Sequence, residues 1–497
     1  MERLLSAAAT VVLMTVIVVS INKFIPAFSN LHKKPASKNT QVPVWKYLWE
    51  RLTDPLGYLE GICYQHPGPI VPFQSVPFIG RKLLLVNNAE VASLIYRKSR
   101  VLSLYPLVGN LIRPLSISLR EYEGLNPNKD PTYPVIKQLE HVTHTAMAPA
   151  LIHDMHTRGF KDDDSLVAAL EDYKNDEPVL YLRFLRRLTA PKGYKALKKF
   201  QAAFTSYYDA GHVSQSSPVI QERYASYRKH WENPSIAAVE VMILQAAVMN
   251  FTSSVFWMLN FIFSDSELLK DVRGELEGIC TVITTEPIIE ASHSDEPQAK
   301  PKVATIDTNT LLASCPLIVS LWMETLRVTS CAVSSRRAVE DTVLEGGHAI
   351  HKGSTVNVIV APMLRDPAIW GPDADDFVPD RFVSRNGETG RLELQPLKGV
   401  RRKAFLPFGG GASWCPGRHF VTHQVMFSVA AMVLGCEITG RDGSPVQRLE
   451  LGRIKFFEGV RHPAGDLEVT IRRRKGFENM RFEAVVDPSA PMATLPF

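Results

Sequence analysis

The stretch that decides the fold is Phe405-Leu-Pro-Phe-Gly-Gly-Gly-Ala-Ser-Trp-Cys-Pro-Gly-Arg-His-Phe420. Its three consecutive glycines let the backbone turn tightly and approach a flat ligand closely, because glycine has no Cβ. Cys415 ends this loop, and Pro416 suits the first position of a following helix. A helix start offers free N–H groups and a partial positive charge, which lower the pKa of a thiol. We therefore expect Cys415 to be a thiolate metal ligand, the alternative being a glycine-rich turn with a structural cysteine.

The spacing within this loop resembles the haem-binding signature of the cytochromes P-450. Phe408, Gly411, Cys415 and Gly417 meet the pattern Phe-x-x-Gly-x-x-x-Cys-x-Gly. The resemblance implies haem b (iron protoporphyrin IX) with Cys415 as its axial thiolate and the other three residues at the cofactor. A thiolate ligand pushes electron density toward O–O cleavage. The implied fold is the cytochrome P-450 fold, mainly α with a minor β portion, in a single large haem domain.

Two further motifs resemble the same family. Glu324 and Arg327 lie three residues apart, so on a helix they share a face and can pair, as many surface residues do. The later segment Phe377-Val-Pro-Asp-Arg-Phe382 resembles the family's Pro-x-Arg-Phe element. The resemblance implies that Arg381 joins Glu324 and Arg327 in a structural triad. A buried network of this kind is costly to break at one member.

The chain departs from the family at the haem propionates. Two residues before the cysteine the family usually has Arg or His, whereas this chain has Ser413. His144 stands where the family's helix arginine is expected, with a surface histidine as the alternative. Arg336 is the other candidate, because a guanidinium suits bidentate contacts with a carboxylate. We expect His144 and Arg336 to bind the cofactor.

The long apolar run at residues 236–263 predicts a core helix, because Glu240, Gln245, Asn250 and Asn260 interrupt it. There the family usually shows Ala-Gly-x-Asp/Glu-Thr, and the acid and hydroxyl route protons to bound oxygen. In this chain Thr252 replaces the acid and Ser253 the threonine. We therefore expect a relay through Ser253 and water, without a carboxylate. The predicted apolar substrate pocket includes Ala247, Phe251 and Val333.

A softer resemblance links the chain to the branch with prostacyclin synthase and the sterol 7-alpha- and 12-alpha-hydroxylases. Asn250 followed by Phe256-Trp257 carries it, together with the segment Arg327-Val-Thr-Ser-Cys-Ala-Val-Ser-Ser-Arg336. This branch holds both oxygen-consuming hydroxylases and isomerases that need no external electrons. Both chemistries therefore stay open.

The N-terminus predicts a membrane anchor. Residues 4–21 carry no charge, and more Lys lies after them than before them, which places the rest of the chain in the cytosol. A cleaved signal peptide is the alternative. The six cysteines are scattered without a CxxC pair, as in a reducing compartment. We expect an anchor at 1–28, a linker at 29–44 and the catalytic domain at 45–497, on the endoplasmic reticulum membrane as a single-pass protein.

Composition and local pattern complete the prediction. The chain has 497 residues, 45% hydrophobic, and a net charge of +5, with no basic stripe that suggests nucleic acid. Short strands are expected at 68–74, 81–87, 355–360 and 467–472, and an exposed loop at 284–308.

The resemblance implies a monooxygenase that hydroxylates or otherwise oxidises a lipophilic small molecule, a terpenoid, sterol or similar compound, in secondary metabolism. It would use O2 and electrons from NADPH through the membrane-bound cytochrome P-450 reductase. Lys398, Arg401, Arg402 and Lys403 offer that partner a positive surface, or form a solvated basic loop. Three alternatives are an isomerase or dehydratase that uses the same haem without external electrons, a non-catalytic haem protein, and an interaction module without haem.

Overall fold

The computed structural model describes residues 55–66, 68–74, 82–104, 107, 168–170, 172–173, 175–176, 180, 186–284, 302–454, 459–485, 493 and 495. The chain divides into two units, Met1–Tyr58 and Leu59–Phe497. The second unit contains the glycine-rich loop with Cys415 and all of the described strands. The predicted anchor, the predicted linker and His144 lie outside the described residues.

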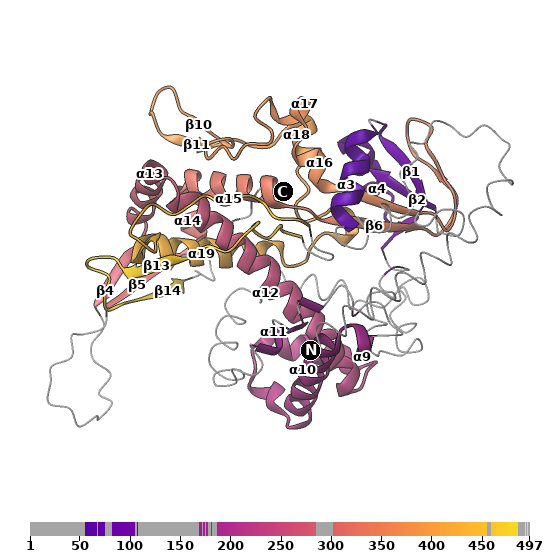
Figure 1. The fold of residues 1–497 in the computed structure, drawn as a ribbon, viewed down its shortest axis with the longest axis horizontal. Helices are drawn as coiled ribbons and strands as arrows, with labels where there is room; N and C mark the ends of the chain where they lie inside the picture. The colour runs from indigo at the N-terminus through magenta and orange to yellow at the C-terminus, as the bar shows by residue number, and fades with distance from the viewer. Residues whose placement is uncertain are drawn as a thin grey trace. The chain divides into compact units, whose positions relative to one another are not determined.

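The longest described helix is α12 (Asn233–Phe263), which has a proline in its first turn. Its N-terminal part packs on α10 (Pro191–Asp209) through Ala238 and Val241. Its C-terminal part packs on α15 (Pro316–Thr329) and α19 (Arg418–Gly435) through Met258 and Ile262 (Figure 1). The predicted helix at 236–263 is confirmed and begins three residues earlier.

Among the described residues, α12 is the single unbroken helix long and apolar enough to cross a membrane. Its polar side chains, however, are paired inside the protein. Glu240 accepts hydrogen bonds from Arg223 at 2.9 and 2.7 Å, and both side chains are buried. Asn260 donates to the carbonyl of Gln447 at 2.8 Å and accepts from the N–H of Leu449 at 3.1 Å. This pattern is typical of a helix that crosses a protein core.

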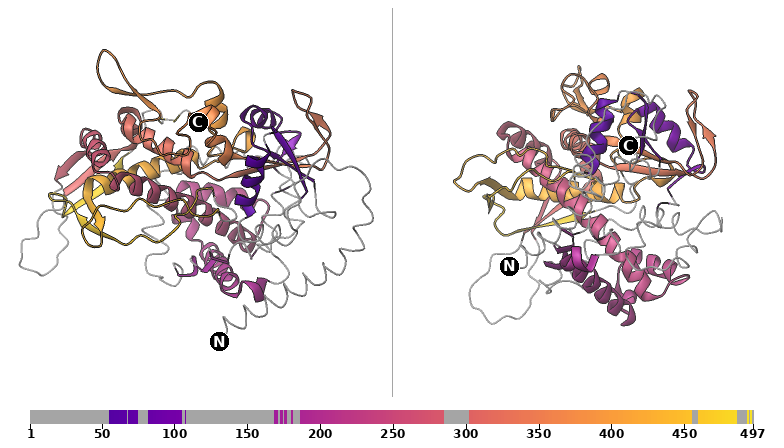
Figure 2. Two further views of the ribbon diagram at one scale, coloured as in Figure 1. Left: turned by 45° about the horizontal axis from the view of Figure 1, so that its top comes forward. Right: turned by 45° about the vertical axis from the view of Figure 1, so that its right-hand side comes forward.

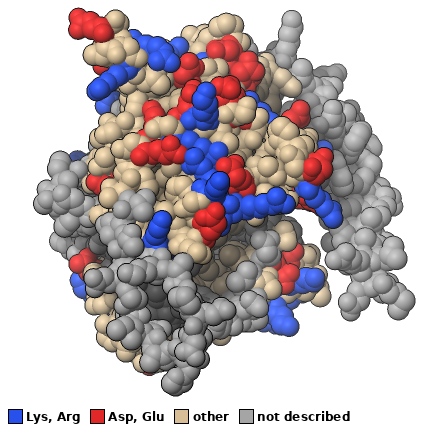
Figure 3. Space-filling view, turned by 90° about the vertical axis from the view of Figure 1, so that its left-hand side faces the viewer, with Lys and Arg blue, Asp and Glu red and all other residues tan. Residues whose placement is uncertain are grey.

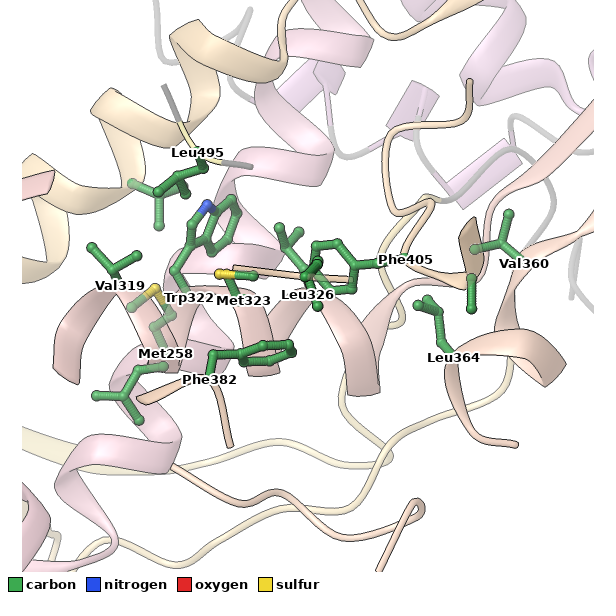
Figure 4. Close-up of a cluster of buried hydrophobic side chains, with 14 of the residues drawn as sticks. Met258, Val319, Trp322, Met323, Leu326, Val360, Leu364, Phe382, Phe405 and Leu495 are labelled. Carbon is green, nitrogen blue, oxygen red and sulfur yellow. The ribbon is translucent and has the colours of Figure 1, made fainter. Parts of the chain in front are cut away.

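The helical core centres on α15, in which every residue from Leu317 to Thr329 is buried. Figure 4 shows Trp322, Met323 and Leu326 of this helix against Met258 of α12 and Phe405. Trp322 has no exposed surface. Full burial of a side chain such as Met323 or Leu326 stabilises the fold by roughly 1.5–3 kcal/mol, so this cluster contributes to holding the helices together.

The larger sheet has five strands in the order β1-β2-β9-β6-β3. They are β1 (Ile70–Gln74), β2 (Lys82–Val86), β9 (Thr355–Ile359), β6 (Val333–Ala338) and β3 (Leu102–Ser103). The antiparallel pairing of β1 with β2, in which Ile70 faces Val86, confirms the first two predicted strands. β9 confirms the strand predicted at 355–360. Figure 2 shows this sheet beside α4 (Ala89–Arg97).

A second sheet corrects the sequence analysis. The predicted loop at 284–308 contains β5 (Lys302–Asp307), which lies between β14 (Met480–Val485) and β4 (Thr281–Thr284). β5 is parallel to β14, which lies far along the chain, so no local sequence pattern predicts this strand. The strand predicted at 467–472 is confirmed as β13 (Val469–Arg473), antiparallel to β12 (Cys436–Gly440).

The fold is therefore mainly α with a minor β portion. The remaining described elements are α3 (Pro55–Gln65), α9 (Arg186–Thr189), η3 (His212–Gln215), α11 (Pro218–Arg228), α13 (Ser266–Glu277), α14 (Thr308–Ser314), β7 (Thr342–Val343), β8 (Ala349–Ile350), α16 (Val360–Leu364), α17 (Pro367–Trp370), β10 (Val383–Arg385), β11 (Leu392–Leu394), α18 (Gly399–Ala404) and η4 (Gly411–Ser413).

Candidate functional site

Cys415 lies in a turn between η4 and α19. Its N–H donates to the carbonyl of Phe408 at 2.9 Å, which folds the glycine-rich loop back on itself. Gly409 and Gly411 have φ of +76° and +66°, in the left-handed region that side chains avoid. A Cβ on Gly417 would lie 3.9 Å from the sulfur of Cys415. The four signature residues thus form one compact loop around the thiol.

The glycines of this loop contact α4. A Cβ on Gly410 would lie 2.8 Å from Cδ2 of Tyr96, and one on Gly411 would lie 2.7 Å from its carbonyl oxygen. Neither distance leaves room for a side chain. The close neighbour of both glycines on the side of a Cβ is therefore Tyr96. Tyr96 was missed because its helix has an ordinary amphipathic pattern.

The start of α19 also differs from the expectation. The helix begins at Arg418 with Gly417 at its N-cap, so Pro416 precedes the helix and does not occupy its first position. The N–H groups of Gly417 and Arg418 and the charge of Arg418 do lower the pKa of the Cys415 thiol. Burial is the larger effect, however, and it raises this pKa above its ordinary value. The sequence argument counted the helix start but not the loss of water around the sulfur.

Arg336 extends from β6 to the same loop and is only 2% exposed. Its Nη2 donates to the carbonyl of Gly410 at 3.2 Å, and its Nη1 donates to Ser334 and to the carbonyl of Ser335. The guanidinium lies 5.3 Å from the ring centre of Tyr96, and its buried Nε has no hydrogen-bond partner. No described carboxylate pairs with it. A buried cation without an anion at the cysteine loop fits a haem propionate.

The structure brings Glu324, Arg327 and Arg381 together in the core. The carboxylate of Glu324 accepts from Arg327 at 2.7 and 2.8 Å and from Nε of Arg381 at 3.0 Å. The side chains of Glu324 and Arg327 have no exposed surface, and that of Arg381 is 6% exposed. Arg327 also donates to the carbonyls of Leu364, Ala374 and Asp376. The hydrogen bonds of these three residues therefore connect α15 to the segment between α16 and β10.

Ser253 points toward the C-terminal segment. Its Oγ lies 3.2 Å from Nδ1 of His462, at hydrogen-bond distance. On the same side of α12, Asn250 accepts from the N–H of Gly459 at 3.0 Å and Trp257 donates to the carbonyl of Arg461 at 2.6 Å. His462 was not found from the sequence, because the contact joins residues 209 positions apart.

The other predicted residues on α12 face elsewhere. Phe251 packs against the main hydrophobic core, roughly 160° around the helix from Ser253 at about 100° per residue. The hydroxyl of Thr252 is exposed and donates to the carbonyls of Val248 and Met249 in its own helix. Phe251, Thr252 and Ser253 therefore face three different directions around α12, and the relay through Ser253 and water stays a prediction. The side chain of Ala247 lies outside the described residues.

Val333, the third predicted substrate contact, packs against a small buried cluster with Cys63, Val71 and Ile359. The predicted basic surface consists of exposed residues. Within it Arg401 donates to the carbonyl of Ile369 at 3.0 Å, and Lys403 pairs with Glu90. Part of this positive charge is therefore already engaged.

Comparison with known proteins gives a consistent result. The family model described as "Cytochrome P450" matches residues 229–455. A cytochrome P450 monooxygenase of Hypoxylon pulicicidum is 29% identical over 63% of this chain and 59% of its own length. A cytochrome P450 monooxygenase of Gibberella zeae is 24% identical over 84% of this chain and 77% of its own length. The 25-hydroxycholesterol 7-alpha-hydroxylase of Rattus norvegicus is 25% identical over 51% of this chain and 58% of its own length. The matched part thus spans less than two thirds of two of these relatives.

Proposed function

We propose that this chain, whose residues 229–455 match the cytochrome P450 family model, is a haem-thiolate monooxygenase of a lipophilic small molecule. Cys415 and Arg336 together carry this proposal. A thiol with two N–H groups directed at it lies in the same loop as a buried guanidinium that lacks an anion. Cys415 would hold the iron of a haem through its sulfur, and Arg336 would pair with one of its propionates, so both groups would be satisfied at once.

In the proposed site, Cys415 binds the iron and Arg336 binds a propionate. Bound haem supplies the activation of O2 for insertion into a C–H bond. Phe408, Gly411 and Gly417 shape the loop that holds the sulfur, and His144 stays the predicted second propionate ligand. The N–H groups of Gly417 and Arg418 and the charge of Arg418 favour the thiolate form of Cys415 that the iron would bind, against the opposing effect of burial.

The relatives' printed names support the substrate class. Two are named as cytochrome P450 monooxygenases, and one is named for a hydroxylated sterol. We propose a bulky terpenoid, sterol or similar lipid, with Ala247, Phe251 and Val333 as predicted contacts. We further propose that NADPH–cytochrome P-450 reductase donates the electrons, with Lys398 and Arg402 in its docking surface. Attachment to the endoplasmic reticulum membrane through residues 1–28 belongs to the same proposal.

A second candidate is an isomerase or dehydratase that uses the haem without external electrons. Two observations favour the isomerase or dehydratase. Thr252 stands where the family usually has an acid, and Ser253 lies at hydrogen-bond distance from His462, so the usual proton route is absent. Turnover of lipid substrates with and without NADPH and reductase separates the two. A monooxygenase needs both components, whereas an isomerase converts a peroxide substrate without them.

The first test is the ferrous–carbon monoxide difference spectrum. The wild-type protein should show a band at about 450 nm, and Cys415→Ala should lose it while the far-ultraviolet circular dichroism stays unchanged. Cys280→Ala, at a half-buried thiol outside the signature loop, is the control and should keep the band. A band at about 420 nm in a fresh, folded sample, or no haem uptake, would refute the thiolate assignment.

A further inference from the structure

Three neighbouring residues of α12 carry hydroxyl groups, and one of these groups is directed out of the helix. The hydroxyl of Thr252 donates to carbonyls of its own helix, and that of Ser254 donates to the carbonyl of Asn250 at 2.7 Å. The Oγ of Ser253 instead lies 3.2 Å from Nδ1 of His462. Ser253 is only 5% exposed, so the contact lies inside the protein. The hydroxyl of the predicted relay therefore meets a titratable side chain.

Residues 459–462 are fixed to α12 on both sides of this contact. One turn of the helix before it, Asn250 accepts the N–H of Gly459 at 3.0 Å. One turn after it, Trp257 donates to the carbonyl of Arg461 at 2.6 Å. A Cβ on Gly459 would lie 3.1 Å from the amide oxygen of Asn250, so little space remains between the segment and the helix. The imidazole is therefore presented to the hydroxyl from a firmly attached backbone.

The same segment is also bound to two other helices. The N–H of Cys331, just after α15, donates to the carbonyl of Gly459 at 3.0 Å, and the N–H of Arg461 donates to the carbonyl of Thr329 at 2.9 Å. The guanidinium of Arg461 pairs with Glu60 of α3 at 2.6 Å. The segment thus contacts α12, α15 and α3, and this gives the imidazole a defined position in the fold.

No acid stands beside this hydroxyl in the described part of the chain, where its hydrogen-bond partner is His462 and not Asp or Glu. Acidic side chains do occur at the surface. Figure 3 looks at the side that carries α13 and the β4–β5–β14 sheet, where they are interspersed with basic ones. Glu267 of α13, for example, is 82% exposed and pairs with Lys270. Hydrated, paired acids of this kind are not placed to deliver a proton to the buried Ser253.

We propose that His462 holds the proton for Ser253 and so replaces the carboxylate that the family usually has at the position of Thr252. This inference rests on the proposed haem-thiolate function. His462 acts through Ser253 and is therefore a positioning residue. Histidine suits the task because its charge changes between about pH 5 and 8.

The proposed step moves one proton. The Nδ1–H of the His462 imidazolium donates to Oγ of Ser253, and the hydroxyl passes its own proton to the leaving oxygen of a peroxide. That oxygen keeps both electrons of the O–O bond, at the expense of two electrons from the haem, and leaves as an alcohol or water. The serine regains a proton from the imidazolium, which becomes neutral. Solvent then returns a proton to His462, which is only partly buried.

The contact is tested first, without turnover, in full-length protein with ¹⁵N-labelled histidine. The ring signals of His462 are assigned by their loss in His462→Gln. Ser253→Ala should shift the Nδ1 signal, because it removes the hydrogen-bond partner of this nitrogen. Ser254→Ala makes the same change at the adjacent buried serine, which is 2% exposed, and should leave the signal in place. No shift in Ser253→Ala, or an equal shift in both variants, would overturn the proposal.

The proton transfer is tested with cumene hydroperoxide in the haem-loaded protein, without NADPH or reductase. This peroxide gives 2-phenyl-2-propanol when the leaving oxygen keeps both electrons and takes a proton, and acetophenone when the O–O bond breaks homolytically. The ratio of alcohol to ketone should fall about tenfold or more in Ser253→Ala and in His462→Gln, since a positioned acid contributes roughly 10²–10⁴-fold. Ser253→Thr keeps a hydroxyl and should keep the ratio.

Two further variants separate a relay from a structural contact. Trp257→Phe removes the hydrogen bond to Arg461 and loosens the same segment, but it should leave the ratio unchanged. Ser253→Ala with His462→Gln should match either single variant, because two residues that act as a unit lose their effect once. An unchanged ratio in His462→Gln, effects that multiply in the double variant, or an equal fall in Trp257→Phe would each contradict the relay.

The carbon monoxide spectrum separates failure of this inference from failure of the proposed function. A band at about 450 nm in all of these variants, together with an unchanged ratio in His462→Gln, contradicts the relay and leaves the thiolate assignment intact. A wild-type protein without that band contradicts the proposed function, and the ¹⁵N signal of His462 still decides whether the contact with Ser253 exists.

Discussion

Replacement of Glu324 by alanine tests the core of the fold most directly. The carboxylate has no exposed surface and accepts from Arg327 and Arg381, and also from the N–H of Val378 at 2.9 Å. Glu324→Ala removes this acceptor and leaves the guanidinium of Arg327 fully buried. Three carbonyls still accept its protons, but no described negative charge is left to pair with it.

The expected magnitude follows from the burial. Loss of one member of a buried ion pair costs about 3–5 kcal/mol, because a charge is left without water or partner. The unit Leu59–Phe497 has about 440 residues, for which the unfolding entropy of roughly 2.1 cal/mol/K per residue gives about 0.9 kcal/mol per degree. The midpoint of thermal unfolding should therefore fall by about 3–5 °C.

The assay is thermal unfolding by circular dichroism, with Glu90→Gln as the control. Glu90 pairs with Lys403 at the surface, where the two side chains are 57% and 42% exposed. An exposed pair contributes about 0–1 kcal/mol, so this variant should shift the midpoint by about 1 °C or less. The double variant Glu324→Met with Arg327→Met should recover part of the loss, because it also removes the unpaired charge of Arg327, while Arg381 keeps its ion pair with Asp373 at 3.0 Å.

Equal shifts for Glu324→Ala and Glu90→Gln would refute this reasoning, since the buried charge would then carry no special cost. So would a double variant that is less stable than Glu324→Ala. The stability of the triad would in that case arise from packing of the side chains and not from their charges.

Two further predictions concern the helix that follows the cysteine and the loop before it. Burial is the main cause that lowers the pKa of His423 below its ordinary 6.5, and its Nδ1 lies 2.8 Å from Oγ1 of Thr308. The folded state therefore favours neutral His423, so this stability is present above pH 6.5 and is lost as the pH falls through the lower folded pKa. His423→Gln should reduce the drop in the unfolding midpoint between pH 7.5 and pH 5.5. The control His351→Gln, at an exposed histidine, should leave this drop unchanged. If His423→Gln also left it unchanged, the lowered pKa of His423 would not be a cause of the loss of stability in acid. Gly411→Ala should lower the haem-to-protein ratio more than Gly443→Ala, because both have positive φ but only Gly411 lacks room beside Tyr96; equal ratios would show that the contact with α4 does not matter.

Local sequence patterns were sufficient to predict the parts of the protein that depend on near neighbours along the chain. The apolar run at 236–263 predicted α12, and the adjacent strand patterns predicted β1 and β2. The spacing around Cys415 predicted a compact loop before a helix, which the structure contains. These features follow from local rules, since helix periodicity, strand alternation and glycine turns act within a few residues.

The environment of the candidate site, in contrast, depends on contacts that form only when the whole chain folds. Tyr96 beneath the glycines, His462 beside Ser253 and the pairing of β5 with β14 all join segments far apart in the chain. The pKa of Cys415 depends on such contacts too, because burial raises it more than the N–H groups of Gly417 and Arg418 lower it. A helix start can be read from residues near the cysteine, but the desolvation that outweighs it comes from atoms that only folding brings around the sulfur.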